Sequence, residues 1–279
     1  MIRHVRPKYR CGYDDKIHQA DAPSRPIARS YAGPGLLAHV AIAKYTDHLP
    51  LYRQSQIYSR EGVELSRSTL ADWIGKTSAL LRPLNDALQC YVLQADKVHT
   101  DDTPVPVLHP GKKSTKQGRL WGYLRDDQAP PAVVVQLLTS RKAQWPAAHL
   151  KGFEGILQAD AYAGYQSLYA TGKIIEAGRW AHVRRKFFEV DKVQPDSFAR
   201  EVLESIAAVY GIEQQIKGKS AEQRQQVRKA RAGPILKQLN KRLQGVKTQI
   251  PKKLPLAKAI HYALVRWDAL VRYLNNTET

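Results

Sequence analysis

The spacing of apolar residues changes twice along the chain, and these two changes limit the folds that it can adopt. From Gly35, apolar residues recur every three or four positions, which predicts amphipathic helices. After Ala95 the pattern becomes that of strands, with short β-branched runs separated by turns. Beyond Pro195 helical spacing returns. The sequence therefore predicts an α/β region between two helical ones.

Four regions follow from these changes. Residues 1–34 form a basic segment that we expect to be irregular, because it ends in a proline-broken linker. Residues 35–94 predict helices, and Pro83 is expected to kink or break the last of them. Residues 95–192 predict a mixed sheet in the order β-β-β-α-β-α-β-α. Residues 193–279 predict helices again.

A helix-turn-helix outline is visible in the first helical region. A short helix ends at Gly62, and Ser66 or Ser68 caps the next helix, which opens with Arg67, Ser68 and Thr69 as candidate DNA contacts. Ordinary three-helix packing gives the same pattern. Trp73 is more typical of a core residue than of a base contact.

Basic residues greatly outnumber acidic ones. The 279 residues contain 44 Lys and Arg against 25 Asp and Glu, a net charge of +19. Residues 217–253 hold twelve basic residues and one acid, so 12 − 1 = +11 lies in that stretch alone. Nucleic acid is the commonest intracellular polyanion, and Lys237, Lys241 and Arg242 are candidate DNA contacts. Ribosome binding and a solvated helical face are the alternatives.

Membrane and secreted classes are not indicated. No apolar run approaches the roughly 18 residues of a membrane span, and no secretion signal is visible. Cys11 and Cys90 lie far apart, which argues against a disulfide framework and favours a reducing cytosol. We expect a cytoplasmic protein.

Two aspartates mark a candidate active site. Asp101 lies on the first predicted strand of the α/β region, and Asp160 ends the fourth, although Asp160 could also be an ordinary turn residue that caps a helix. This layout is similar to that of ribonuclease H-like nucleotidyl transferases, whose first and fourth strands are adjacent. Adjacent carboxylates repel unless a cation lies between them, and Mg²⁺ suits them. Asp102 should point to the opposite face and meet solvent or the edge of the site.

Sequence motifs along nearly the whole chain resemble the transposase of the insertion sequence 66 family. They are "RPKYRC", "LLAHVAIAKYTDHLPLYRQ", "GVELSRSTLADWIG", "HTDDTPVPVL", "GRLWGYLRDD", "GILQADAYAGY", "WAHVRRKFFEV" and "AIHYALVRWDALVRYL". The resemblance implies a ribonuclease H-like fold with a helical insertion, and cutting and joining of DNA at element ends. It implies that Asp101 and Asp160 are the first two catalytic acids and hold Mg²⁺ or Mn²⁺. It further implies double-stranded DNA, self-association or accessory proteins of the element as partners, and a nucleoid-associated location in a bacterial cytoplasm.

The chain departs from the family pattern at three places. Cys11 has Asp14 where a second zinc-binding cysteine is expected, and neither His4 nor His18 restores the spacing, so we expect no zinc. Arg179 replaces a cysteine before "WAH". The motif of the third catalytic acid is missing: Glu278 lies in a tail without it, and Glu189 is expected to be a surface residue.

We therefore expect a transposase copy that is cut short and inactive. The rival hypothesis is a non-catalytic DNA-binding remnant that occupies transposon ends. A ribonuclease H-like nuclease acting on RNA or repair junctions is a third possibility. In "HVRRKFF", Arg184, Arg185 and Lys186 are either DNA-phosphate contacts or a solvated face, while Phe187 and Phe188 are expected in the core.

Overall fold

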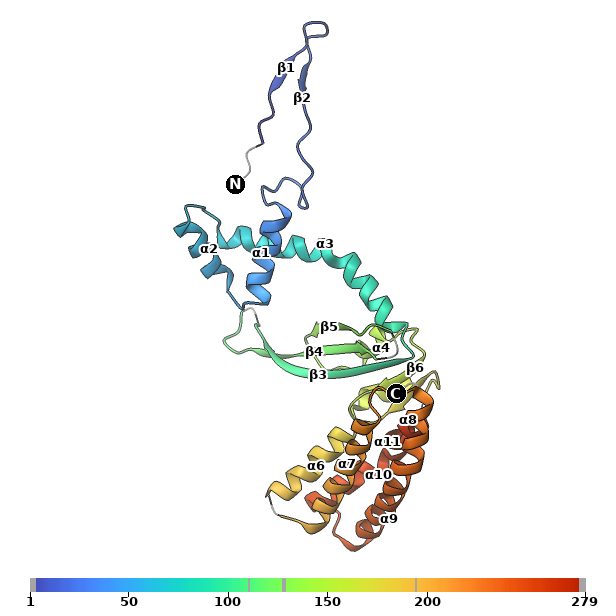
Figure 1. Ribbon diagram of the computed structural model, residues 1–279. Helices are drawn as coiled ribbons and strands as arrows, with labels where there is room; N and C mark the ends of the chain where they lie inside the picture. The colour runs from blue at the N-terminus through green and yellow to red at the C-terminus, as the bar shows by residue number, and fades with distance from the viewer. Residues whose placement is uncertain (1–3, 110, 127–128, 194, 276–279) are drawn as a thin grey trace. The chain divides into compact units, whose positions relative to one another are not determined.

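A computed structural model describes residues 4–109, 111–126, 129–193 and 195–275 of the chain (Figure 1). The chain forms two compact units, residues 1–86 and residues 87–279. Helix α3 (Arg67–Leu93) begins in the first unit and ends in the second.

The first unit begins with a hairpin, where an irregular segment was expected. Strands β1 (Lys8–Arg10) and β2 (Ile17–Gln19) pair antiparallel. The Cys11 N–H donates to the Lys16 carbonyl over 2.8 Å, and Asp15 adopts a left-handed φ of 57° that closes the turn. Both strands are exposed on all sides, so they carry no alternation of apolar and polar residues by which the sequence could have predicted them.

Helices α1 (Pro34–Tyr45), α2 (Leu51–Arg60) and the first turns of α3 enclose a small core. Trp73 belongs to that core, 3% exposed, as predicted. Ser66 is the cap of α3, because its Oγ accepts from the Thr69 N–H over 3.1 Å. The expected break at Pro83 is wrong, because α3 continues through it. The proline removes one backbone hydrogen bond, but the leucine- and alanine-rich turns on either side favour the helix.

The second unit is built on a five-stranded mixed sheet of order β5-β4-β3-β6-β7 (Figure 1). Strands β3 (Lys97–Val107), β4 (Lys116–Arg125) and β5 (Ala132–Leu138) pair antiparallel, while β6 (Gly155–Gln158) and β7 (Ile174–Ala177) run parallel to β3. The connecting helices are α4 (Gln144–His149), the 3₁₀ turn η1 (Ala163–Tyr165), α5 (Gln166–Tyr169) and α6 (Trp180–Val193). The predicted order of elements and the pairing of the first and fourth strands are confirmed.

Gly155 lets β6 lie directly against the start of β3. A Cβ at this position would lie 2.5 Å from the carbonyl oxygen of Asp96, and its φ of +151° disfavours other residues. The neighbouring Ile156 N–H donates to that same carbonyl over 2.8 Å. The close approach starts the parallel pairing that carries both candidate acids.

Residues 195–275 are mainly helical, as the apolar spacing predicted. The elements are α7 (Ser197–Gln215), α8 (Ala221–Val227), the π-turn η2 (Arg228–Ala232), α9 (Gly233–Gln249), α10 (Pro255–Val265), α11 (Trp267–Val271) and the 3₁₀ turn η3 (Arg272–Leu274). Val202, Ile206 and Val209 of α7 pack with Phe187 of α6 in one core. Among the described residues, no helix is both long and apolar enough to cross a membrane.

Candidate active site at the paired ends of β3 and β6

Parallel pairing joins β3, which contains Asp101, to β6, which ends two residues before Asp160. Lys97 pairs with Ile156 and His99 with Gln158, a constant offset of 59 positions. Asp101 and Asp160 have the same offset in sequence, but β6 ends at Gln158, so the pairing stops two residues before Asp160. Strand β3 continues to Val107, so Asp101 lies within β3, whereas Asp160 lies just beyond the end of β6.

Asp101 and Asp102 point to opposite faces of β3, as alternation requires. The Asp101 side chain is 57% exposed, whereas the Asp102 side chain is 2% exposed. Of the two expectations for Asp102, contact with solvent is wrong, whereas its shared contact with Arg141 places it beside Asp160 at the candidate site. The Asp102 carboxylate is buried because two arginines neutralise it.

Arg141 joins Asp102 to Asp160. Its Nη2 lies 2.7 Å from Oδ1 of Asp102 and 2.8 Å from Oδ2 of Asp160, and its Nε donates to Asp102 Oδ1 over 3.0 Å. Arg119 Nη1 contacts the other oxygen of Asp102 at 2.9 Å. A single guanidinium thus serves two carboxylates that come from separate strands.

Tyr162 holds this arrangement from the other side. Its backbone N–H donates to Asp160 Oδ1 over 3.1 Å, its ring lies 4.4 Å from the Arg141 guanidinium, and its hydroxyl donates to the Arg141 carbonyl. Gly164 makes room for the ring, since a Cβ there would lie 2.1 Å from Tyr162 Cε1. The glycine of "DAYAGY" therefore has a packing role at the site.

Arg179 ties the strand ends together. Its Nη2 donates to the carbonyls of Thr100 on β3 and Gln158 on β6, over 3.1 and 3.2 Å, while Nη1 lies 3.4 Å from Asp101 Oδ2. His182, one turn into α6, is half-buried. Burial lowers the pKa of His182, and the charge of Asp101 opposes that shift.

The side chains at this edge suit a hard divalent cation, with one condition. Carboxylate oxygens are the ligands that Mg²⁺ and Mn²⁺ prefer. Asp101 is open to solvent, and its contact with Arg179 is long for a hydrogen bond. Asp160 is 22% exposed, but its Oδ2 is in contact with Arg141. An ion that takes Oδ2 of Asp160 as a ligand competes with Arg141 for that oxygen.

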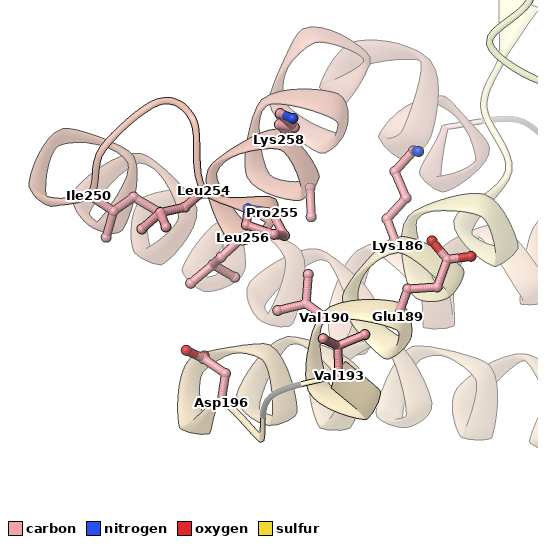
Figure 2. Close-up of a pocket in the computed structure, with 11 residues that line it drawn as sticks. Lys186, Glu189, Val190, Val193, Asp196, Ile250, Leu254, Pro255, Leu256 and Lys258 are labelled. Atoms are coloured by element: carbon pink, nitrogen blue, oxygen red, sulfur yellow. The ribbon is translucent and has the colours of Figure 1, made fainter.

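The third acid considered from the sequence is not placed beside this pair. Glu189 lies seven residues beyond His182 on α6, about 10 Å along the helix axis. It projects near Lys186 at the rim of a pocket of about 640 Å³ between α6 and the start of α10 (Figure 2). Glu278 lies outside the described residues.

The basic residues of α6 do not share one face. Arg184 and Arg185 line a groove between α6 and α7 together with Phe188 and Tyr210. Lys186 instead lies 4.8 Å from the ring of Tyr262 on α10. Phe187 is fully buried as expected, but the same expectation for Phe188 is wrong, since it is 48% exposed in that groove.

The basic stretch 217–253 is also divided. Lys237 and Lys241 are exposed and line an open groove along α9. Arg242 pairs with Glu201 of α7 through two hydrogen bonds of 2.7 and 2.8 Å. Arg228 is 4% exposed and pairs with Glu213. At least one of the twelve basic residues is therefore buried away from any large partner.

Two N-terminal predictions concern the first unit. Arg67 and Ser68 are exposed at the first turn of α3, and Thr69 is half-buried. In the hairpin, one potential ligand atom from each of Cys11, Asp14 and His18 lies within 4.8 Å of the others. Folding thus gathers three groups that spacing alone had not brought together. A structural zinc site takes four.

Sequence reasoning missed Arg119, Arg141 and Tyr162, and it noted Arg179 only as a departure from a motif. No local pattern marks the arginines, because their partners lie far along the chain, whereas Tyr162 is only two residues from Asp160. Arg141 is 39 positions from Asp102, and Arg179 is 78 from Asp101. The one available signal was the number of arginines in the same region as the acids.

One family model matches most of the chain. The family model described as "Transposase IS66 family" matches residues 29–279. Two curated relatives come from Sinorhizobium fredii (strain NBRC 101917 / NGR234). The uncharacterized protein y4jD is 38% identical, covering 98% of this chain and 56% of the relative. The uncharacterized protein y4qI is 37% identical, covering 97% and 52%. The chain thus spans about half the length of these relatives.

A solved structure, the Mos1 transposase paired-end complex with left transposon end, can be aligned with this chain. The alignment covers 94% of this chain and 83% of the Mos1 chain. The Mos1 chain is 11% identical with a TM-score of 0.20, which is too low to establish a shared fold.

Proposed function

The chain belongs to the IS66 transposase family, and on that premise we propose that it serves DNA transposition by metal-dependent cleavage and strand transfer at insertion-sequence ends. The observation that supports this proposal is the parallel pairing of β3 with β6, because Asp101 lies on β3 and Asp160 follows β6 by two residues. The sheet order and the helices after β7 support a ribonuclease H-like core with a helical insertion.

Asp101 and Asp160 are the proposed ligands of Mg²⁺ or Mn²⁺. Such ions, when bound, stabilise the attacking and leaving oxygens of a phosphoryl transfer. The protein's own contribution is to fix the two carboxylates. Arg179 ties together the ends of their strands, and the Tyr162 N–H orients Asp160. We propose no structural zinc, because the hairpin gathers three ligands.

DNA binding is proposed to use several basic surfaces. The candidates are the first turn of α3 in a helix-turn-helix arrangement, the groove that contains Arg184 and Arg185, and the groove that contains Lys237 and Lys241. Exposed Lys and Arg contact phosphates without reading sequence. The same proposal includes the partners and the location of the chain. The DNA partner is a double-stranded element end, and the protein partners are other copies of the chain or accessory proteins of the element. The location is the nucleoid.

Catalysis by this chain alone is proposed to be weak or absent. Glu189 lies about 10 Å along α6 from His182, and Glu278 lies outside the described residues. Losing the support for one metal costs several kcal/mol of transition-state stabilisation, and 1.36 kcal/mol is tenfold in rate, so we expect a loss of about a thousandfold or more. The alternative is a non-catalytic DNA-binding protein that occupies element ends.

Two measurements test these proposals. The first is a nicking assay on supercoiled DNA that carries element ends, with Mg²⁺ or Mn²⁺ present. The second is a titration that measures the binding of Mn²⁺ to the chain. We expect Mn²⁺ to bind the unmodified chain, Asp101→Ala and Asp160→Ala each to weaken that binding, and nicking to be absent. Nicking that Asp160→Ala abolishes would show the chain to be active, and Glu189→Gln would then test the discounted acid. Mn²⁺ binding that neither substitution changes would overturn the site.

A further inference from the structure

Arg141 occupies one oxygen of an acid that the proposed function assigns to a metal ion. Its Nη2 is shared between Asp102 and Asp160, at 2.7 and 2.8 Å. A guanidinium and a divalent ion both neutralise a carboxylate, so the two compete for Asp160 Oδ2. Asp101 has no such close competitor among the contacts of the described residues.

Arg141 does not depend on Asp160 for its position. Two of its three carboxylate contacts go to Asp102, which is buried and also held by Arg119. Tyr162 adds a ring contact with the guanidinium and a hydrogen bond to the Arg141 carbonyl. The side chain thus remains anchored beside the acids if the contact with Asp160 is given up.

A guanidinium presents five N–H donors in a rigid fork that suits phosphate as well as carboxylate. The contacts with Asp102 and Asp160 engage Nε and Nη2, and the Arg141 side chain is 35% exposed. Once Oδ2 is released, the guanidinium stays anchored to Asp102 and has donors that a phosphate can accept from.

We propose that Arg141 is an exchangeable counter-ion: it neutralises Asp160 in the DNA-free protein and transfers that contact to a DNA phosphate when the carboxylate takes a divalent ion. The inference rests on the proposed function. It makes Arg141 a positioning residue that couples metal binding to DNA binding. The free chain therefore binds metal weakly until DNA arrives.

The test is the affinity for Mn²⁺, measured by calorimetry on the folded 279-residue chain without DNA. Arg141→Gln should bind Mn²⁺ at least about tenfold more tightly than the unmodified chain, because an adjacent opposite charge shifts a carboxylate equilibrium by one to three pKa units. Arg119→Gln is the matched control, since Arg119 contacts Asp102 on its far oxygen. It should give a clearly smaller change.

A short DNA duplex adds the second measurement. Saturating duplex should tighten Mn²⁺ binding to the unmodified chain, and linkage requires that Mn²⁺ tighten duplex binding equally. Arg141→Gln should lose most of that coupling, and Arg141→Lys, which keeps the charge but not the fork, should retain part of it. Circular dichroism checks that each variant is folded.

Two results would overturn the proposed exchange of Asp160 for a DNA phosphate. One is an Mn²⁺ affinity that is unchanged or weaker in a folded Arg141→Gln chain. The other is coupling between Mn²⁺ and duplex binding that survives this substitution. The failure of the metal site itself has a different signature. In that case Asp160→Ala leaves Mn²⁺ binding unaltered in both the unmodified and the Arg141→Gln backgrounds.

Discussion

Arg179 Nη1 lies 3.4 Å from Asp101 Oδ2, too far for a strong charge-assisted hydrogen bond. Asp101 therefore remains open to solvent, while Asp160 has a guanidinium at 2.8 Å. The two candidate acids thus differ in accessibility: the Asp101 side chain is 57% exposed and the Asp160 side chain 22%. Arg179 makes its shorter hydrogen bonds to the backbone, because its Nη2 donates to the carbonyls of Thr100 and Gln158.

Removing Arg179 should loosen the strand ends. Arg179→Ala deletes two hydrogen bonds from a charged donor to partly buried carbonyls, so we expect the free energy of unfolding to fall by about 1–3 kcal/mol. Denaturant unfolding measures the change. Arg185→Ala on the exposed face of α6 is the control and should cost under about 0.5 kcal/mol. Equal effects of the two substitutions would contradict the stabilising role of the Arg179 contacts with Thr100 and Gln158.

The order of the α/β elements was predictable because period-two and period-3.6 patterns are local. The predicted neighbours, the strands of Asp101 and Asp160, are paired in the structure. The arginines around the acids were not predictable, since Arg141 meets Asp102 only after folding closes 39 residues. The hairpin strands were not predictable for a different reason. Their pairing is local, but both strands are exposed, so no buried face produces an alternation of apolar and polar residues.

Gly164 should tolerate no side chain. In Gly164→Ala the Cβ would overlap the Tyr162 ring at 2.1 Å, and the ring must move away from Arg141. Such overpacking costs about 1–3 kcal/mol of unfolding free energy. Gly75→Ala is the matched control. It lies within α3 with open space at its Cβ, so alanine should stabilise by about 0.5–1 kcal/mol. Thermal unfolding of both variants decides the matter.

His149 should make stability depend on pH. It is 5% exposed on α4, stacks 3.8 Å from the Tyr123 ring, and burial lowers its pKa to about 4. The unfolded chain, with an ordinary histidine pKa near 6.5, binds more protons between these values. The contribution is therefore present in full above about pH 6.5 and is lost as the pH falls toward 4.

The upper bound of this contribution is about 3 kcal/mol, from 2.5 pKa units at 1.36 kcal/mol each. Urea unfolding at a series of pH values measures the slope. His149→Gln should flatten it between pH 4 and 6.5, whereas substitution of the exposed His39 by Gln should leave it as it is. A slope that persists in His149→Gln would assign it to other groups.

The basic residues of α9 should differ in their effect on DNA binding. Lys237 and Lys241 are exposed along one groove, so neutralising both as Gln should weaken binding. It should also reduce the slope of log K against log[salt] by up to about 2, because each phosphate contact contributes about 0.9. Arg242 is paired with Glu201, and Arg242→Gln should change the slope less. Fluorescence anisotropy over a salt series compares them. An unchanged slope in the double variant would mean that this groove faces solvent in the complex.

Neighbouring basic residues on α6 can be compared directly, because they lie on one helix but contact different elements. Arg184 and Arg185 line the α6–α7 groove, whereas Lys186 stacks on Tyr262 of α10. If DNA follows the groove, replacing both arginines by Gln should lower the affinity and the salt slope, while Lys186→Gln should leave the slope near its original value. The cost of Lys186→Gln should appear instead as a loss of about 0.5–1 kcal/mol of unfolding free energy from the cation–π contact. If the slope responds to Lys186 and not to the arginines, the DNA lies on the α10 side of the helix and the groove is only a surface feature.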